Sequence, residues 1–127
     1  MAARPVSPLL FVASAGSSAT SSAPRTTTPA LGIGVEAVLT ALLVLAVIGT
    51  AVDSRAPKIG GLAIGLAVAA DILVGGPLTG AAMNPARWFG PAVAAGAYAD
   101  WYVWWIGPAI GATVAALIYR STLAEAT

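Results

Sequence analysis

Three long apolar stretches, separated by short polar connections, are the feature that most restricts what this chain can fold into. They cover residues 31–51, 59–75 and 101–119. A helix needs about 20 predominantly apolar residues to cross the hydrocarbon core of a bilayer. Inside that core the backbone polar groups must bond to one another, and a helix achieves this within one segment. The pattern therefore predicts an all-α membrane protein with three transmembrane helices.

Composition supports this class and disfavours others. Charged residues make up 9 % of the chain and hydrophobic residues 58 %, whereas a soluble domain carries about 25 % charged residues. The absence of cysteine and histidine removes thiolate ligands, the commonest general base and the commonest metal ligand. The net charge of +1 gives no sign of a nucleic-acid partner. We expect an integral, multi-pass protein of the lipid bilayer with no catalytic residue, metal or cofactor, rather than a soluble helical protein or an enzyme.

The two ends of the chain differ from its apolar middle. Residues 1–30 are rich in Ser, Thr, Ala and Pro and show no helical period, which predicts a flexible segment outside the membrane. An apolar run at residues 8–15 resembles part of a signal peptide. It is too short to span a bilayer, and a linker remnant is the favoured interpretation. Residues 121–127 form a short polar tail, which leaves residues 31–120 as the membrane domain.

The polar connection after the first apolar stretch predicts the orientation of the chain. It contains Arg55 and Lys58, and short connections that carry Arg and Lys stay on the cytoplasmic side. Three crossings then place Arg120 on the cytoplasmic side and Arg87 in the connection on the opposite side.

Small residues recur at helical spacing in the second and third stretches. Gly61 and Gly65 form one G-x-x-x-G pair, and Gly107 and Gly111 form another. This spacing lets helix backbones approach closely. We expect close packing inside the bundle for both pairs, with a dimer face as the alternative.

Residues 76–95 are too apolar for an ordinary loop and too interrupted for a full span. The interruptions are Gly76, Pro77, Gly80, Pro85, Gly90 and Pro91. A re-entrant segment fits this pattern: a loop enters the membrane and returns as a short half-helix. Such irregular backbone is tolerated where protein or a water-filled cavity satisfies its polar groups.

The four residues "NPAR", 84–87, are predicted to start that half-helix. Asn is a strong N-cap residue and Pro is favoured at the first helical position, so Asn84 should cap a helix from Pro85 to about Ala95. The cap uses the side-chain carbonyl and leaves the amide NH2 as a donor. The positive end of the helix dipole lies at the same place, and Arg87 follows one turn later. A plain helix cap and a snorkelling arginine are the alternatives to a site that attracts oxygen lone pairs and repels cations.

The segment "TGAAMNPARWFGP", residues 79–91, resembles the second signature loop of the aquaporin, or major intrinsic protein, family. The resemblance extends over residues 31–120, in which the three stretches resemble the family's fourth, fifth and sixth spans. Within the family, the tonoplast intrinsic proteins and their bacterial relatives are the most similar. The resemblance implies one inverted repeat of the aquaporin fold: three transmembrane helices plus a re-entrant half-helix.

The resemblance also implies roles for particular residues. Asn84 would donate one of two asparagine hydrogen bonds at the pore centre, and Arg87 would line the constriction. The pore and selectivity residues implied in this way are Asn84, Pro85, Ala86, Arg87, Ile72 and Ala81. The residues implied to be structural or adjacent to the pore are Glu36, Trp88, Ala92 and Trp105.

Glu36, Trp88 and Asp71 carry more specific expectations. Glu36 is expected to accept hydrogen bonds from loop N–H groups rather than to carry protons. Trp88 departs from the family pattern, in which serine or aspartate is usual. Asp71 also departs from it. A carboxyl group at membrane depth is costly unless it is paired or hydrated, so either Asp71 faces an aqueous vestibule or the chain tolerates it poorly.

The function implied by the resemblance is a membrane channel element for passive transport of water. Ile72 and Ala81 imply a wide, less polar filter, which adds ammonia, urea or glycerol-like solutes. The family has two Asn-Pro-Ala loops and this sequence has one, so the alternatives are a truncated, non-conducting fragment and a half that needs a partner half. The resemblance implies a homo-oligomer, a tetramer, or a complementary half as partner, in the plasma membrane or a vacuole-like membrane.

Overall fold

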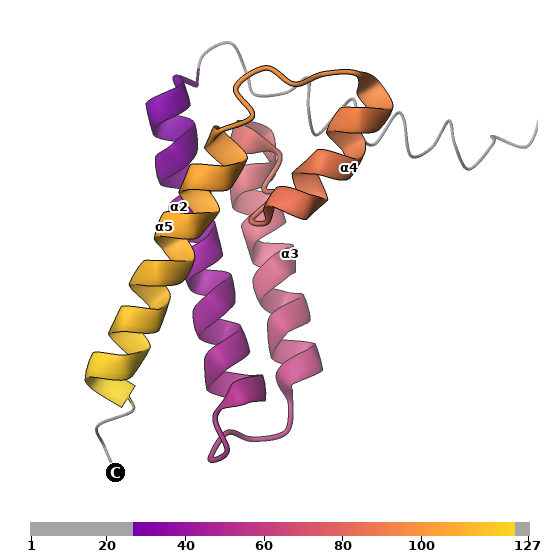
Figure 1. Ribbon diagram of the computed structural model, residues 1–127. Coiled ribbons are helices and arrows are strands. Elements are labelled where there is room, and N and C mark those ends of the chain that lie inside the picture. The colour runs from indigo at the N-terminus through magenta and orange to yellow at the C-terminus, as the bar shows by residue number, and fades with distance from the viewer. Residues whose placement is uncertain (1–26, 124–127) are drawn as a thin grey trace, which may run out of the picture.

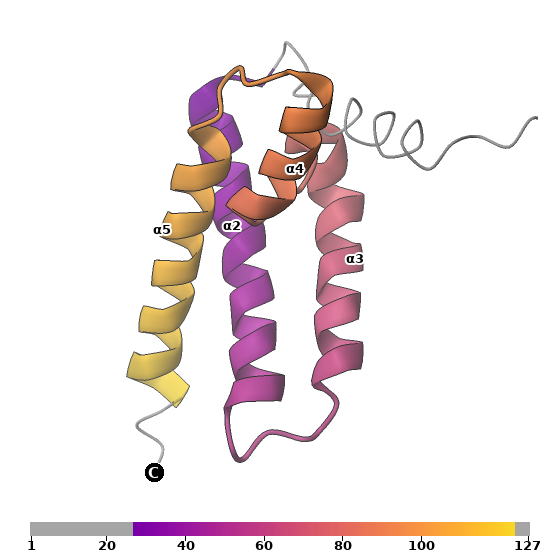
Figure 2. The same cartoon turned by 45° about the vertical axis from the view of Figure 1, so that its right-hand side comes forward.

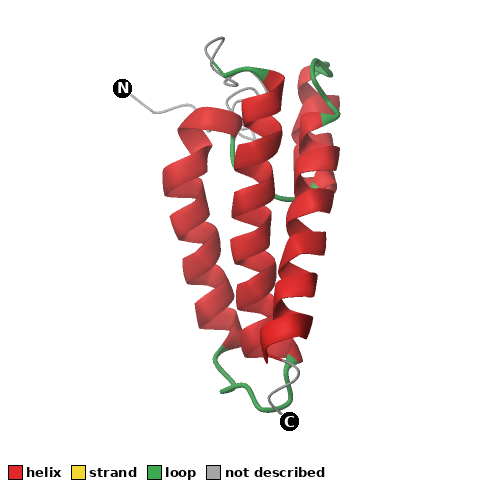
Figure 3. Ribbon diagram, turned by 90° about the vertical axis from the view of Figure 1, so that its left-hand side faces the viewer, coloured by secondary structure: helices red, strands yellow, loops and turns green. Residues whose placement is uncertain are grey.

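The computed structural model describes residues 27–123, which form helices without any strand in that range (Figures 1 and 3). This confirms the all-α class. The elements in chain order are α2 (Pro29–Val47), the π-helical turn η1 (Ile48–Val52), α3 (Gly60–Thr79), α4 (Pro85–Ala95), α5 (Val103–Ile118) and the π-helical turn η2 (Tyr119–Leu123).

Three helical segments are long and apolar enough to cross a membrane: Pro29–Val52, Gly60–Thr79 and Val103–Thr122. They correspond in order to the three predicted spans. Large apolar side chains on their outer faces are exposed, among them Leu62, Leu73 and Leu117. An apolar surface of this extent marks contact with a membrane or another protein. The three long helices run side by side (Figure 2).

Helix α3 is longer than the predicted second span. It continues past residue 75 through Gly76 and Pro77 to Thr79, so these two residues do not break it. Transmembrane helices tolerate internal proline because neighbouring groups satisfy the freed carbonyl. The helix ends at Gly80, whose backbone is left-handed (φ 84°) and whose N–H donates to the Gly76 carbonyl at 3.0 Å.

The ends of the described chain are also more helical than the composition suggests. Thr28 caps α2, with its hydroxyl oxygen accepting from the N–H of Leu31 at 3.3 Å. Residues 27–30, the last of the segment that was predicted to be flexible, are therefore structured. At the other end η2 includes the first residues of the predicted tail. The apolar run at residues 8–15 lies outside the described residues.

Helix α2 is central and packs directly on α5 through two glycines. A Cβ atom on Gly107 would lie 2.6 Å from the Cβ of Glu36, and one on Gly111 would overlap the carbonyl oxygen of Ala37. The close packing predicted for this pair is confirmed. For Gly61 and Gly65 it is wrong within the described residues, because a Cβ there would meet no atom within 4 Å.

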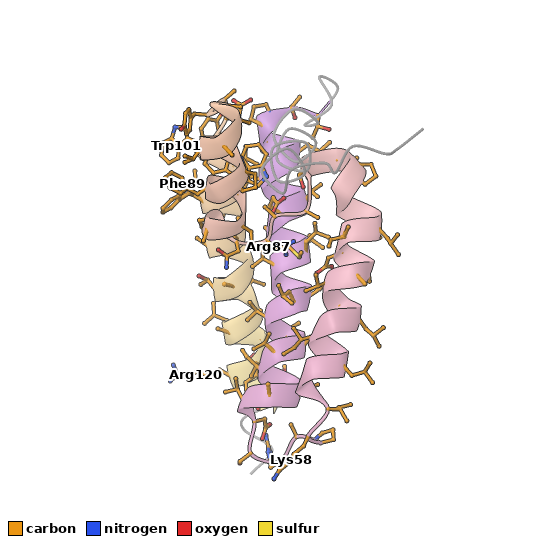
Figure 4. The ribbon with its side chains drawn as sticks, turned by 90° about the vertical axis from the view of Figure 1, so that its right-hand side faces the viewer. Lys58, Arg87, Phe89, Trp101 and Arg120 are labelled. Carbon is orange, nitrogen blue, oxygen red and sulfur yellow. The ribbon has the colours of Figure 1, made fainter. Side chains whose placement is uncertain are left out.

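Lys58 and Arg120 lie at one end of the bundle, and Trp101 lies at the other end (Figure 4). The two cations therefore share one side, which is the arrangement that the charge distribution predicts for the cytoplasmic face.

A polar cluster ties the α2–α3 connection to the end of α5. The Asp53 carboxylate accepts hydrogen bonds from Nε and Nη2 of Arg55, at 3.1 and 2.9 Å, and from the hydroxyl of Tyr119. The hydrogen bonds from Arg55 are the main reason why the pKa of Asp53 lies below its ordinary value. The cluster thus joins the α2–α3 connection to η2 at the end of the bundle that carries Lys58.

Asp53→Asn is expected to loosen this end of the bundle, and the effect should depend on pH. Because the pKa of Asp53 is lowered in the folded protein, its contribution to stability is complete above the ordinary pKa of about 4. It is lost as the pH falls through the lowered value. Unfolding of wild type and variant in mixed micelles, followed by circular dichroism, should differ equally at pH 7 and pH 5. The exposed neighbour variant Ser54→Ala should match wild type. A difference that already vanishes between pH 7 and pH 5 would contradict the assignment.

Candidate functional site

Helix α4 begins near the middle of the bundle's height and rises to the end where α5 starts (Figures 1 and 2). Asn84 precedes it with extended backbone, and its side-chain oxygen accepts from the N–H of Ala86 at 2.8 Å. Pro85 is the first helical residue, and Gly96 ends the helix with left-handed backbone (φ 63°). The predicted cap and half-helix are therefore both present.

The start of α4 presents hydrogen-bond donors on an accessible surface. The Asn84 side chain is exposed, and its NH2 group donates to none of the residues 27–123. The Arg87 side chain is also exposed and forms no salt bridge within the described chain. Figure 4 shows Arg87 at mid-height, between Trp101 at one end and Lys58 at the other. These donors coincide with the positive end of the α4 dipole.

An open groove of about 530 Å³ runs beside this start. It is lined by Asn84, Pro85, Ala86, Phe89 and Trp105. The groove brings together the Asn-Pro-Ala motif at the start of α4 and Trp105 on α5. Phe89 was not among the predicted residues. Its position four residues after Pro85 places it on the same helical face, and this spacing is the signal that could have found it.

A second, smaller hollow lies next to the groove and is aromatic. It has a volume of about 260 Å³ and is lined by Trp88, Phe89, Tyr98, Trp101 and Trp105. The rings of Trp101 and Trp105 meet edge to face with centroids 6.4 Å apart. In residues 27–123 no three acidic side chains come together to bind a metal.

Other predicted site residues lie away from the groove lining. Ile72 is exposed on α3, with 43 % of its side-chain surface accessible. Ala81 is fully buried and packs with Leu39 and Met83, so its methyl group faces the core between the helices. Arg87 is exposed but does not line the groove. Of the predicted pore residues, Asn84, Pro85 and Ala86 line this groove, and Ile72, Ala81 and Arg87 do not.

Trp88 and Ala92 attach α4 to α5. Both are buried and belong to one apolar cluster with Ala82, Val103 and Trp104. The ring of Trp88 stacks on that of Trp104, with centroids 5.1 Å apart and planes inclined by 12°. Trp88 thus packs α4 against α5.

Glu36 binds the loop that leads into α4. Its side chain is fully buried. One carboxylate oxygen accepts from the Thr79 hydroxyl at 2.6 Å and from the N–H of Ala82 at 3.1 Å. The other accepts from the N–H of Met83 at 2.7 Å. Glu36 on α2 therefore holds the loop that leads into α4 by two of its N–H groups.

The loop has an unfavourable backbone conformation that these bonds hold in place. Ala81 and Met83 have positive φ angles of 47° and 55°, next to Gly80. Non-glycine residues rarely adopt such angles, at a cost of about 1–3 kcal/mol each. The hydroxyl of Thr40 adds a bond to the Met83 carbonyl at 3.4 Å. Sequence inspection missed Thr40, since nothing in its local pattern distinguishes it from other residues of the span.

Thr79 was also missed, although it links three elements. Its hydroxyl accepts from the N–H of Ala81 at 3.2 Å and donates to Glu36. Its carbonyl accepts from the indole N–H of Trp104 at 3.0 Å. α2, α3 and α5 therefore meet at Thr79, directly before the loop.

Asp71 does not face an aqueous vestibule, so the first of its two predicted alternatives is wrong. It is 3 % exposed and lies on the same face of α3 as Gly75 and Thr79, which are also buried. This face of α3 packs on α2, where Leu39 meets Gly75. The burial of Asp71 follows from its spacing of four and eight residues from these two positions.

Comparisons with known proteins agree with the resemblance. A family model described as "Major intrinsic protein" matches residues 3–119. "Aquaporin TIP4-4" of Zea mays is 48 % identical over 90 residues, which are 69 % of this chain and 36 % of that protein. "Aquaporin TIP2-1" of Arabidopsis thaliana is 60 % identical over 58 residues, which are 46 % of this chain and 23 % of that protein. The matched segments thus span 23 % to 36 % of the length of these relatives.

The family match covers most of the chain, including the signature segment, all three spans and the half-helix. Members of this family are channels rather than enzymes, which supports the expectation of a non-enzymatic protein. The most similar proteins include tonoplast intrinsic proteins of plants. The chain is an integral, multi-pass membrane protein, and it belongs to the major intrinsic protein family.

Proposed function

We propose that the chain forms one wall of a channel for the passive permeation of water. The observation that carries this proposal is the capped start of α4 at mid-depth, where Asn84 lines an apolar groove. In an apolar groove, a few fixed donors determine which permeant can leave bulk water. Residues 31–120 would be the channel-forming unit, with residues 1–30 and 121–127 outside it.

The groove would act through hydrogen bonding and electrostatics. The Asn84 amide can donate to the oxygen of a water molecule that has lost neighbours in the groove. Because the positive end of α4 lies at the same place, cations are repelled from it. No covalent bond is made or broken, so no catalytic group is needed.

The same proposal assigns selectivity to the residues that family resemblance indicated. Arg87 would add a positive barrier, and Ile72 an apolar surface that favours small neutral solutes such as ammonia, urea or glycerol-like molecules. Ala81 would contribute through the backbone of its loop, since its methyl group is buried.

A second candidate function is that of a half-channel, which conducts only when a complementary half-channel completes the pore. The observation that favours it is that the groove is open on one side. The missing wall would come from a different, complementary chain. Without such a wall the protein would be non-conducting.

Osmotic shrinkage of proteoliposomes tests both candidates. If chains assemble a complete pore, liposomes that contain the protein should shrink faster than protein-free liposomes at equal lipid composition. If permeability equals that of protein-free liposomes while the chain is inserted and helical, the first proposal fails for this chain alone. Adding candidate partner halves and repeating the measurement then tests the second candidate.

Arg87→Val should change selectivity without affecting insertion. The Arg87 side chain is exposed and has no salt bridge in the described chain, so helical content should be unchanged. Loss of its charge should raise the permeability to urea relative to water on the order of tenfold, which corresponds to about 1.4 kcal/mol in the barrier. Stopped-flow light scattering measures both permeabilities.

Arg120→Val is the matched control, since Arg120 is an exposed arginine at one end of the bundle. It should leave the ratio of the two permeabilities unchanged. An equal ratio in Arg87→Val and wild type would remove Arg87 from the proposed constriction.

A further inference from the structure

The aromatic hollow beside the groove is a surface feature that the proposed permeation of water does not explain. The rings that line it come from α4, from α5 and from the connection between them: Trp88, Phe89, Tyr98, Trp101 and Trp105. The chain has four Trp, three Tyr and two Phe, so more than half of its aromatic residues meet here. The volume of about 260 Å³ lies below the range of about 300–1,000 Å³ for pockets of drug-sized ligands. The hollow therefore suits a small chemical group.

The rings around the hollow are held in place by contacts with one another. Trp101 meets Tyr102 edge to face, with centroids 6.2 Å apart and planes inclined by 83°. It meets Trp105 in the same way, at 6.4 Å and 77°. Trp88 is buried and stacks on Trp104. Rings that are fixed before a ligand arrives lose little freedom on binding, so this hollow is preorganised.

The charge distribution around the hollow favours a cation. The face of an aromatic ring is negative, and a cation within about 6 Å of a ring centroid is attracted to it. Asp100 directly precedes Trp101 and is exposed, and its carboxylate accepts from the Tyr102 hydroxyl at 3.1 Å. Asp100 is the one charged residue between positions 88 and 119. Its negative charge adds to the attraction of the ring faces.

The lysine and arginine side chains of residues 27–123 are absent from the lining of the hollow. Arg87 precedes Phe89 by two residues, which turns the two side chains about 200° apart around α4. Figure 4 shows Phe89 and Trp101 on the same side of the molecule, with Arg87 at mid-height and Lys58 at the far end. This part of the chain thus supplies ring faces and a carboxylate to the hollow, and no cation.

The depth of the hollow indicates where a cationic ligand would come from. Trp101 lies two residues before the third spanning segment, Val103–Thr122, at the level of the lipid head groups. A quaternary ammonium group carries a positive charge on an apolar surface, and aromatic cages recognise this combination. We propose that the hollow binds the choline head group of a membrane lipid, with its trimethylammonium group against the rings of Tyr98, Trp101 and Trp105.

The choice between lipids follows from hydration. A primary ammonium group, as in phosphatidylethanolamine, has three hydrogen-bond donors. The rings of the hollow cannot satisfy these donors as water does, so transfer of this head group from water is costly. The trimethylammonium group has no donor to satisfy. We therefore expect phosphatidylcholine to bind about three- to tenfold more tightly than phosphatidylethanolamine with the same acyl chains.

Nuclear magnetic resonance of the full chain in phosphatidylglycerol nanodiscs tests this preference. Each of the four Trp residues gives one indole N–H signal in isotope-labelled protein, assigned by substituting each Trp in turn with Phe. Added phosphatidylcholine should shift the signals of Trp101 and Trp105 to saturation. The Trp104 indole donates to the Thr79 carbonyl and lies outside the hollow, so its signal should stay constant and report an intact fold. Equal responses to phosphatidylcholine and phosphatidylethanolamine would overturn the proposal, because the rings would then only anchor the chain at the interface.

Two variants test the rings themselves, with the Trp105 signal as the readout. Trp101→Leu and Tyr98→Leu keep an apolar side chain and remove a ring, so each should need about three- to tenfold more phosphatidylcholine for half-saturation. Tyr119→Leu removes a ring at the other end of the bundle and should bind as wild type does. If Trp101→Leu changes the Trp104 signal, and thus the fold, Tyr98→Leu decides.

Wild-type binding by a ring variant that keeps the Trp104 signal would overturn the proposal. Soluble choline, added to the same nanodiscs, tests the source of the group. Saturation by soluble choline without any response to phosphatidylcholine would overturn the lipid as the occupant. None of these measurements involves permeation, so their outcome is independent of the proposed channel function.

Discussion

Glu36→Ala is expected to destabilise the bundle by about 3 kcal/mol or more, because three buried hydrogen-bond donors lose their acceptor. The substitution leaves the Thr79 hydroxyl and the N–H groups of Ala82 and Met83 without their acceptor. Each unsatisfied buried donor costs about 1–3 kcal/mol. The left-handed backbone of the loop also loses its support. Unfolding in SDS-containing mixed micelles, followed by circular dichroism, measures the change.

Two further variants make this result specific. Val38→Ala alters an exposed residue of the same helix and should have a small effect. Glu36→Gln keeps one acceptor oxygen but places an NH2 group against an N–H group of the loop, so its effect should be intermediate. The assignment of Glu36 as the main support of the loop would fail if Glu36→Ala unfolded at the same SDS fraction as Val38→Ala.

Gly111→Ala is expected to separate α2 from α5. A Cβ atom there would overlap the carbonyl oxygen of Ala37 and lie 2.9 Å from its carbonyl carbon. Both are backbone atoms, which cannot move aside as the end of a flexible side chain can. Overpacking of this kind costs about 1–3 kcal/mol, and it opposes the gain of about 1 kcal/mol that alanine brings to a helix over glycine. The same SDS unfolding measurement should show a net loss of stability.

Gly65→Ala is the matched control. It also alters a glycine of a G-x-x-x-G pair on a spanning helix, but a Cβ at this position meets no atom within 4 Å. It should leave stability unchanged or increase it slightly. Equal effects of the two variants would mean that α2 and α5 do not approach as closely as the structure shows.

The transmembrane architecture could be predicted because bilayer thickness fixes the length of an apolar run. The boundaries were less accurate, since Gly76 and Pro77 are helix breakers by local rules and yet lie inside α3. Tertiary surroundings in the membrane override those rules. The two glycine pairs have the same spacing, and only the packing of α2 on α5 distinguishes Gly107 and Gly111 from Gly61 and Gly65.

At the candidate site the local chemistry was predictable and the long-range contacts were not. Asn84 and Pro85 are neighbours in sequence, so the cap and the helix start follow from their own preferences. The bonds from Glu36 to the loop span 46 and 47 residues, and no sequence pattern shows that separation. The burial of Asp71 was unpredictable for the same reason, because it depends on which face of α3 meets α2.

The left-handed loop at residues 80–83 affects the order in which the helices of this protein can assemble. The Ala81 N–H has one local bond, to the Thr79 hydroxyl. The acceptors for the N–H groups of Ala82 and Met83 belong to a helix that is synthesised more than 40 residues earlier. The loop therefore cannot settle while it is the newest part of a growing chain. α2 and α3 must first meet in the membrane and present the Glu36 carboxylate. We expect the half-helix to take its place as a late step of assembly, at a depth set by the helices that were inserted before it.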